Sequence, residues 1–119
     1  MDRTIEYRQI IERILHEHLE ETPQRENVET VAIVDETREH FLLIDMGWQL
    51  PRRIYSVVFH VWLKDGKFHV EQDWTEYGVA RQLLDAGIPP KDIALDFQPP
   101  NVRHLAQELM ATRRDTITA

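Results

Sequence analysis

Apolar and polar residues alternate along the middle of the chain with a period of two, the pattern of half-buried β-strands. The alternation falls into four runs, and short polar links join each run to the next. Consecutive strands with short connections usually pair as neighbours, so the pattern predicts a four-stranded antiparallel meander. The predicted strands cover residues 28–35, 40–48, 54–63 and 67–74, with a turn at residues 36–39.

An Asp-Gly pair at Asp65 and Gly66 sets the register between the third and fourth strands. A type I′ turn needs a positive φ at both central positions, and Asp-Gly tolerates this well. Side chains alternate across the pleat, so counting outward from the turn assigns each residue to a face. The predicted core face holds Val57, Phe59, Val61, Leu63, Phe68, Val70, Gln72 and Trp74, and the opposite face holds Val58, His60, Trp62, His69, Glu71 and Asp73.

Before and after the predicted strands in the sequence, apolar residues recur at the spacing of one face of a helix. Residues 4–21 form the first predicted helix, with Thr4 as its N-cap and Pro23 just beyond its end. A second helix is predicted to start at Thr75 as N-cap and to stop at Gly87, a residue suited to the C′ position. The inward side chains of the second helix are predicted to be Val79, Ala80, Leu83 and Leu84.

The last quarter of the chain contains a short extended run and a third helical pattern. Residues 93–97 can add a short fifth strand at the sheet edge, and Pro100 suits the first turn of a helix. Arg113 and Arg114 fit its C-terminal end, where the helix dipole favours cations. The fold class is therefore α+β, with an N-terminal helix and one or two C-terminal helices on the apolar face. The inward positions of the third helix are predicted to be Val102, Leu105, Ala106, Leu109 and Met110.

Composition limits the classes of function. The 119 residues fit one domain, residues 1–119, and the absence of cysteine removes thiol nucleophiles and thiolate metal sites. A net charge of -7 disfavours unaided DNA binding, which depends on Lys and Arg displacing counterions. The longest apolar run is too short for a membrane span, and Met1 to Thr4 lack a signal-peptide pattern, so we expect a cytoplasmic protein.

Two sets of side chains are candidates for a site, one on the predicted outer face and one made of acidic residues. His60, His69, Glu71 and Asp73 offer ligand types that bind zinc or manganese, but a half-exposed contact surface explains the same pattern. We therefore predict no metal or other cofactor. Asp45, Glu71, Asp73 and Glu76 could be imagined as an acidic nuclease centre. Such a centre needs a carboxylate-x-Lys element, but in Glu71-Gln72-Asp73 an acid occupies the position of the lysine. We therefore predict no catalytic residues.

A basic pair, Arg52 and Arg53, lies beside Trp48 at the predicted end of a hairpin. Guanidinium groups pair with phosphates or carboxylates, although a solvated hairpin end needs no ligand. Together with the outer-face aromatic and histidine residues, this pair predicts a surface that binds another protein. The predicted partner-binding residues are Trp48, Arg52, Arg53, His60, Trp62 and His69.

An ordered set of short motifs resembles the XisI-like family, the fdxN element excision controlling factors found mainly in cyanobacteria. The motifs occur in family order over nearly the whole chain. They are Tyr7 in the first helix, Gly47-Trp48-Gln49, Arg52-Arg53-Ile54-Tyr55, Lys64-Asp65-Gly66-Lys67, Asp73 with Thr75-Glu76, Gly78 and Ala80, Gly87-Ile88-Pro89, Lys91-Asp92-Ile93, and Phe97 with Pro99-Pro100 and Arg103.

The resemblance implies a non-enzymatic accessory factor rather than an enzyme. Family members are connected with programmed excision of a DNA element, alongside a recombinase and a companion protein, XisH, that resembles restriction-endonuclease folds. We thus expect binding to an XisH-like partner, indirect contact with DNA, no membrane association and a possible homodimer. The alternatives are a direct DNA-binding recombination factor and a metal-dependent hydrolase.

Overall fold

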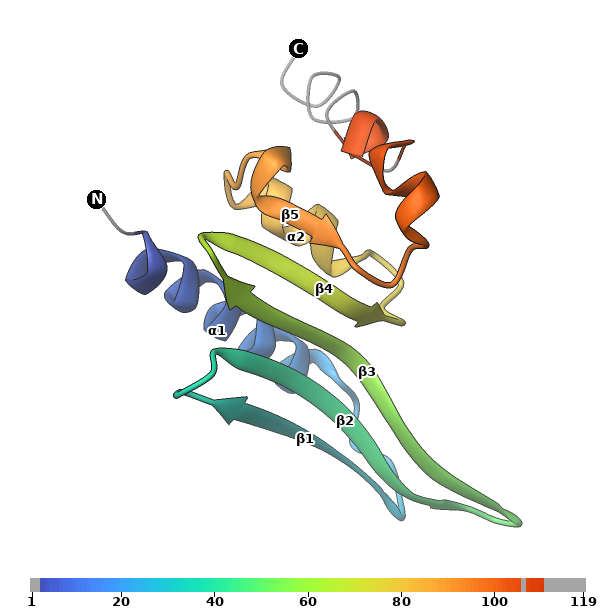
Figure 1. Cartoon of the computed structure of the whole chain (residues 1–119). Coiled ribbons are helices and arrows are strands. Elements are labelled where there is room, and N and C mark those ends of the chain that lie inside the picture. Colours follow the sequence, from blue (N-terminus) through green and yellow to red (C-terminus); the bar gives the residue numbers. More distant parts are fainter. Residues whose placement is uncertain (1–2, 106, 111–119) are drawn as a thin grey trace.

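A helix and a five-stranded sheet form the main layers of the protein in a computed structural model (Figure 1). The structure describes residues 3–105 and 107–110. Residues 103–105 and 107–110 are helical. The named elements are α1 (Thr4–Glu21), β1 (Val28–Asp35), β2 (His40–Gln49), β3 (Arg52–Lys64), β4 (Lys67–Asp73), α2 (Val79–Asp85), the 3-10 turn η1 (Pro90–Asp92), β5 (Ile93–Leu95) and the 3-10 turn η2 (Pro100–Val102).

The strand order is β1-β2-β3-β4-β5, and the first four strands are antiparallel, which confirms the predicted meander. The short fifth strand is also present, and it runs parallel to β4. A parallel neighbour cannot be reached through a tight turn, so α2 and η1 make the crossover between β4 and β5. The sheet is therefore mixed, with one parallel edge pair.

The turn between β3 and β4 has the predicted conformation, with φ of 54° at Asp65 and 74° at Gly66. Its register is as predicted from Lys64 and Lys67 out to Val61 and Val70. Beyond that point a β-bulge shifts the register, so His60 pairs with Gln72 and Phe59 with Asp73. Glu71 is the extra residue. Counting outward from the turn alone would pair His60 with Glu71 and Phe59 with Gln72, and this part of the predicted register is wrong. Asp73 consequently lies on the helix-covered side instead of the predicted outer side.

A second bulge interrupts the pairing of β2 with β3. Leu43 pairs with Phe59 and Ile44 with Val57, which leaves Val58 as the extra residue. Val58 packs against the hydrophobic core, and Val57 pairs with the outward-facing Ile44. The predicted faces of Val57 and Val58 are thus reversed. The prediction that Trp74 lies in the core is also wrong, since Trp74 follows β4 and is 76% exposed.

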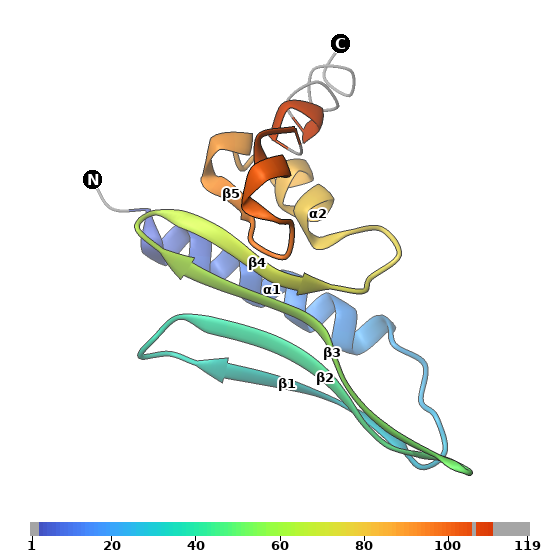
Figure 2. The same ribbon diagram turned by 45° about the vertical axis from the view of Figure 1, so that its right-hand side comes forward.

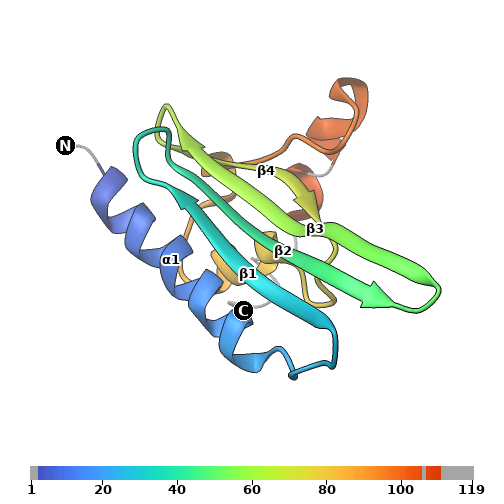
Figure 3. The same cartoon turned by 90° about the horizontal axis from the view of Figure 1, so that it is seen from below.

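The core lies between one face of the sheet and the helices α1 and α2, as predicted (Figure 2). Seen from below, α1 runs along one side of the sheet (Figure 3). Figure 1 shows the opposite side of the strands without a covering helix among the described residues. We call this side the open face. Fully buried core side chains include Ile11, Phe41, Leu43, Phe59, Val61, Phe68, Val70, Val79, Leu83 and Ile93.

The helix ends differ from the predicted caps at their N-termini. Arg3 occupies the N-cap position of α1 without a side-chain bond, and Gly78 occupies that of α2. Thr4 and Thr75 are therefore not N-caps. Instead, the Asp73 carboxylate accepts the Val79 N–H at 2.7 Å and satisfies one free donor of α2.

The C-terminal stop of α2 at Gly87 is confirmed, with a φ of 95°. The Gly87 N–H donates to the Leu84 carbonyl at 3.0 Å, and the Ile88 N–H donates to the Leu83 carbonyl at 3.1 Å. These bonds form a Schellman motif, and the buried Ile88 anchors the chain that follows.

The third predicted helix packs less than expected. Met110 is buried, but Leu105 and Leu109 are 49% and 71% exposed, so the predicted inward face is wrong at these two positions. Ala106, Arg113 and Arg114 lie outside the described residues. None of the described helices is long and apolar enough to cross a membrane.

Candidate interaction surface

A row of aromatic and imidazole side chains crosses the open face on β2, β3 and β4. Trp62 pairs with His40 on one side and with His69 on the other, so the strand register places the three side by side. The His40 ring stacks on Trp62 with centroids 4.7 Å apart, and the Trp62 and His69 centroids are 5.2 Å apart. The predicted outward positions of Trp62 and His69 agree with this arrangement.

His60 lies next to this row and forms a hydrogen bond with His40. His40 Nδ1 and His60 Nε2 are 2.8 Å apart, so one nitrogen donates and the other accepts. Burial, and then the charge of a protonated His40, lower the pKa of His60 below its ordinary value of 6.5. The bonded pair therefore favours a neutral His60 ring.

Glu71 and Asp96 bring two carboxyl groups to the edge of the row. Trp62 Nε1 donates to Glu71 Oε2 at 2.8 Å, and His69 Nδ1 lies 3.0 Å from Asp96 Oδ2. Burial, and then the hydrogen bond with Asp96, raise the pKa of Glu71. Burial alone would raise the pKa of Asp96, but hydrogen bonds with Glu71 and His69 outweigh burial and lower it. The two acids thus differ in their tendency to hold a proton.

The metal-type set considered from the sequence is only partly brought together. His69 and Glu71 are close, but Asp73 caps α2 and His60 bonds His40. Asp96 is the third member of the cluster, because β5 pairs with β4 up to Val70 and Leu95 and the next residue, Asp96, then lies beside Glu71. Sequence reasoning missed Asp96; the only signal was its position within the short extended run of residues 93–97.

The far end of the open face is the tip of the β2–β3 hairpin. The Arg53 guanidinium carbon lies 5.6 Å from the centre of the Trp48 ring and 5.7 Å from that of Tyr55. Arg53 also donates to the Gly47 carbonyl at 3.0 Å. Trp48 is 49% and Tyr55 70% exposed, so the tip presents a cation held between two accessible rings.

The predicted partner-binding residues thus fall into two groups. Trp48 and Arg53 meet at the hairpin tip, and His60, Trp62 and His69 meet at mid-sheet. Arg52 is exposed but belongs to neither group, because adjacent residues of a strand point to opposite faces. Tyr55, two residues from Arg53, was missed, although the alternation of side chains places it on the same face.

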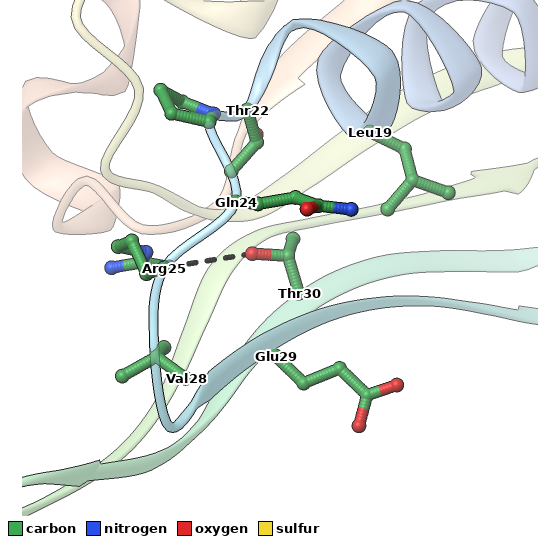
Figure 4. Close-up of a pocket in the computed structure, with 8 residues that line it drawn as sticks. Leu19, Thr22, Gln24, Arg25, Val28, Glu29 and Thr30 are labelled. Atoms are coloured by element: carbon green, nitrogen blue, oxygen red, sulfur yellow. Dashed lines mark hydrogen bonds between the residues drawn. The ribbon is translucent and has the colours of Figure 1, made fainter.

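A polar hollow lies away from both groups, between the end of α1 and β1 (Figure 4). Its volume is about 350 Å³. Arg25 on its wall lies 3.0 Å from Asp45, whose carboxylate also accepts the Thr30 hydroxyl at 2.6 Å. Asp45 is therefore engaged in a local ion pair. The acidic set considered as a nuclease centre does not share one site, since Asp45, Glu71 and Asp73 have different partners.

These features define a small α+β domain that covers one sheet face with helices and leaves the other as a broad polar and aromatic surface. Comparison with protein families identifies it further. The chain belongs to the XisI protein family, whose model matches residues 1–108.

Two crystal structures of proteins from Anabaena variabilis resemble this fold. A XisI-like protein is 32% identical, with a TM-score of 0.81 over 85% of this chain and 93% of its own. The fdxN element excision controlling factor XisI is 30% identical, with a TM-score of 0.73 over 86% of this chain and 99% of its own. A comparison with curated proteins finds no match.

Proposed function

We propose that this protein is a non-enzymatic controlling factor for the excision of a DNA element and that it acts by binding an XisH-like, nuclease-fold partner. Family membership supports the controlling role, because a relative is described as an fdxN element excision controlling factor. The partner, rather than this chain, would then supply the chemistry on DNA in the cytoplasm.

The open face is the observation that carries this proposal. Trp, Tyr and Arg are the residues that most often dominate binding energy at protein interfaces. The hairpin tip presents all three together, with Trp48 and Tyr55 on either side of Arg53. The row around Trp62 continues the same face toward β4. A partner that covers both regions would contact the aromatic and basic residues while the acidic groups stay at the margins.

The overall charge favours a protein partner over bare DNA. The net charge is -7, and Arg53, one of the two arginines of the hairpin tip, is already held against two rings. Nonspecific DNA affinity requires several Lys or Arg contacts to phosphates. A protein partner with its own DNA-binding surface would remove that requirement.

Co-expression with an XisH-like companion, followed by gel filtration, tests the proposal. We expect the two proteins to elute together and Trp48→Ala or Arg53→Glu to weaken the complex by at least about tenfold, as hot-spot truncations do. Tyr77→Ala is a matched control for Trp48→Ala, because both side chains are 49% exposed and Tyr77 lies beside α2 on the helix side. Arg13→Glu on α1 is the control for the charge reversal.

Separate elution of two folded proteins would refute partner binding. Equal weakening by the open-face variants and their controls would refute the assignment of the surface. DNA binding by the isolated protein, with an affinity that falls steeply with salt, would favour a direct DNA-binding factor instead. Light scattering on the same column tests the predicted homodimer.

A further inference from the structure

Three potential metal ligands converge at the β4–β5 edge of the open face. His69, Glu71 and Asp96 each offer one ligand atom, and these atoms lie within 4.8 Å of one another. The side chains of His69 and Asp96 are only 20% and 21% exposed. One imidazole with two carboxylates is a ligand set suited to zinc or manganese. We propose that His69, Glu71 and Asp96 bind one divalent transition-metal ion, Zn²⁺ or Mn²⁺.

The backbone holds these ligands in place before any ion binds. His69 and Glu71 are two residues apart on β4 and therefore share a face. Val70 pairs with Leu95 in the parallel ladder, which brings Asp96 beside Glu71. The chain after Asp96 is fixed by Arg103, which donates to the Asp96 and Gln98 carbonyls at 3.0 and 2.8 Å. Two of the ligands lie on β4, and Asp96 is the first residue after β5, in a turn that Arg103 ties down.

A second layer of contacts orients the cluster. The Trp62 indole N–H donates to Glu71 Oε2, and the Trp62 ring packs beside His69. Hydrogen bonds of this kind set the orientation of metal-ligating carboxylates in proteins. Trp62 is thus a positioning residue for Glu71.

The electrostatics of the cluster favour a cation. Two carboxyl groups lie side by side at a half-buried position, and His69 is their only ion-pair partner in the described part of the chain. Like charges at this separation repel unless a proton or a cation lies between them. Ligand atoms on one zinc ion at bond lengths of about 2.1 Å lie about 3.4 Å apart in tetrahedral geometry, so modest side-chain rotations would close the site.

Calorimetric titration of Zn²⁺ and Mn²⁺ into the untagged, full-length protein tests this site. We expect one equivalent of one of these ions to bind. His69→Gln and Asp96→Asn should each lower the affinity by more than about 100-fold, and Trp62→Phe by about tenfold, as loss of an outer contact does. His16→Gln, which removes an exposed histidine on α1, should leave the affinity unchanged.

A measurement on the unmodified protein keeps the test independent of variant folding. Bound Mn²⁺ should broaden the NMR signal of the Trp62 indole N–H and spare that of Trp48. Trp48 pairs with Arg53, nine residues along β3 from Trp62, or about 30 Å away. The absence of stoichiometric binding, or equal affinities for His69→Gln and His16→Gln, would overturn the proposal. Neither result depends on the proposed partner, because only this protein and the metal are present.

Discussion

Gly47 lies so close to the backbone at the start of β1 that its replacement by alanine gives a sharp test of the fold. Its φ is 151°, and it pairs with Val28 at the start of β1. A Cβ atom at this position would lie 1.9 Å from the Asn27 carbonyl oxygen and 2.7 Å from the Val28 Cα. Both neighbours are backbone atoms, so no side-chain rotation can relieve the clash.

The cost of Gly47→Ala follows from three contributions. The unfavourable φ costs about 1–2 kcal/mol for a residue with a Cβ, and forcing atoms into a packed site costs about 1–3 kcal/mol. Shifting Asn27 also disturbs the 2.8 Å bond from the Trp48 N–H to its carbonyl, a loss of about 1 kcal/mol. The sum is about 3–6 kcal/mol, a large part of the 5–15 kcal/mol typical of a whole domain.

Gly66→Ala is the matched control. Gly66 has a φ of 74°, but a Cβ there would meet nothing within 4 Å, so only the conformational cost of about 1 kcal/mol applies. Urea unfolding followed by circular dichroism, with linear extrapolation, measures both changes. A difference of less than about 1 kcal/mol between the two variants would refute the close approach of Gly47 to β1.

Two further predictions concern neighbouring residues of β3. Val61→Asp should lower the free energy of unfolding by more than about 4 kcal/mol, because Val61 is fully buried and a charge there has no partner. His60→Ala should lower it by only about 1 kcal/mol. Equal decreases in melting temperature for the two variants would show that the register is wrong. Because the pKa of folded His60 is lowered, the unfolded chain takes up its proton first, so stability should fall as the pH drops below about 6.5. His60→Gln should make the melting temperature less sensitive to pH between about 7.5 and 5.5, and an unchanged slope would contradict the assignment.

Local signals in the sequence predicted the elements well. Alternation placed the four long strands, and Asp65-Gly66 and Gly87 marked a turn and a helix end whose φ values confirm them. The two bulges were not predictable in the same way. An extra residue at Val58 or Glu71 leaves the local pattern intact and depends on how neighbouring strands fit together.

The candidate site was also predictable only where its residues are close together in the sequence. The pairing of Trp62 with His69 follows from the turn at Asp65-Gly66, because only six residues separate the two in the sequence. Asp96 follows Glu71 by 25 residues in the sequence. It comes close to Glu71 only because the chain passes through α2 and then pairs β5 in parallel with β4. No local pattern specifies that return. The separation of Arg52 from Arg53, in contrast, needed only the alternation of a strand.

The β2–β3 hairpin extends past the other strands, and its tip lies away from α1 and α2 (Figure 1). Leu50 is 84% exposed and its neighbours are exposed as well, so little apolar packing holds this end closed. Protection against amide hydrogen exchange should therefore decline from the strands over α1 toward the tip, which can fray without unfolding the core. A protein that binds Trp48 and Arg53 would slow amide hydrogen exchange at this end and leave exchange in the core unchanged.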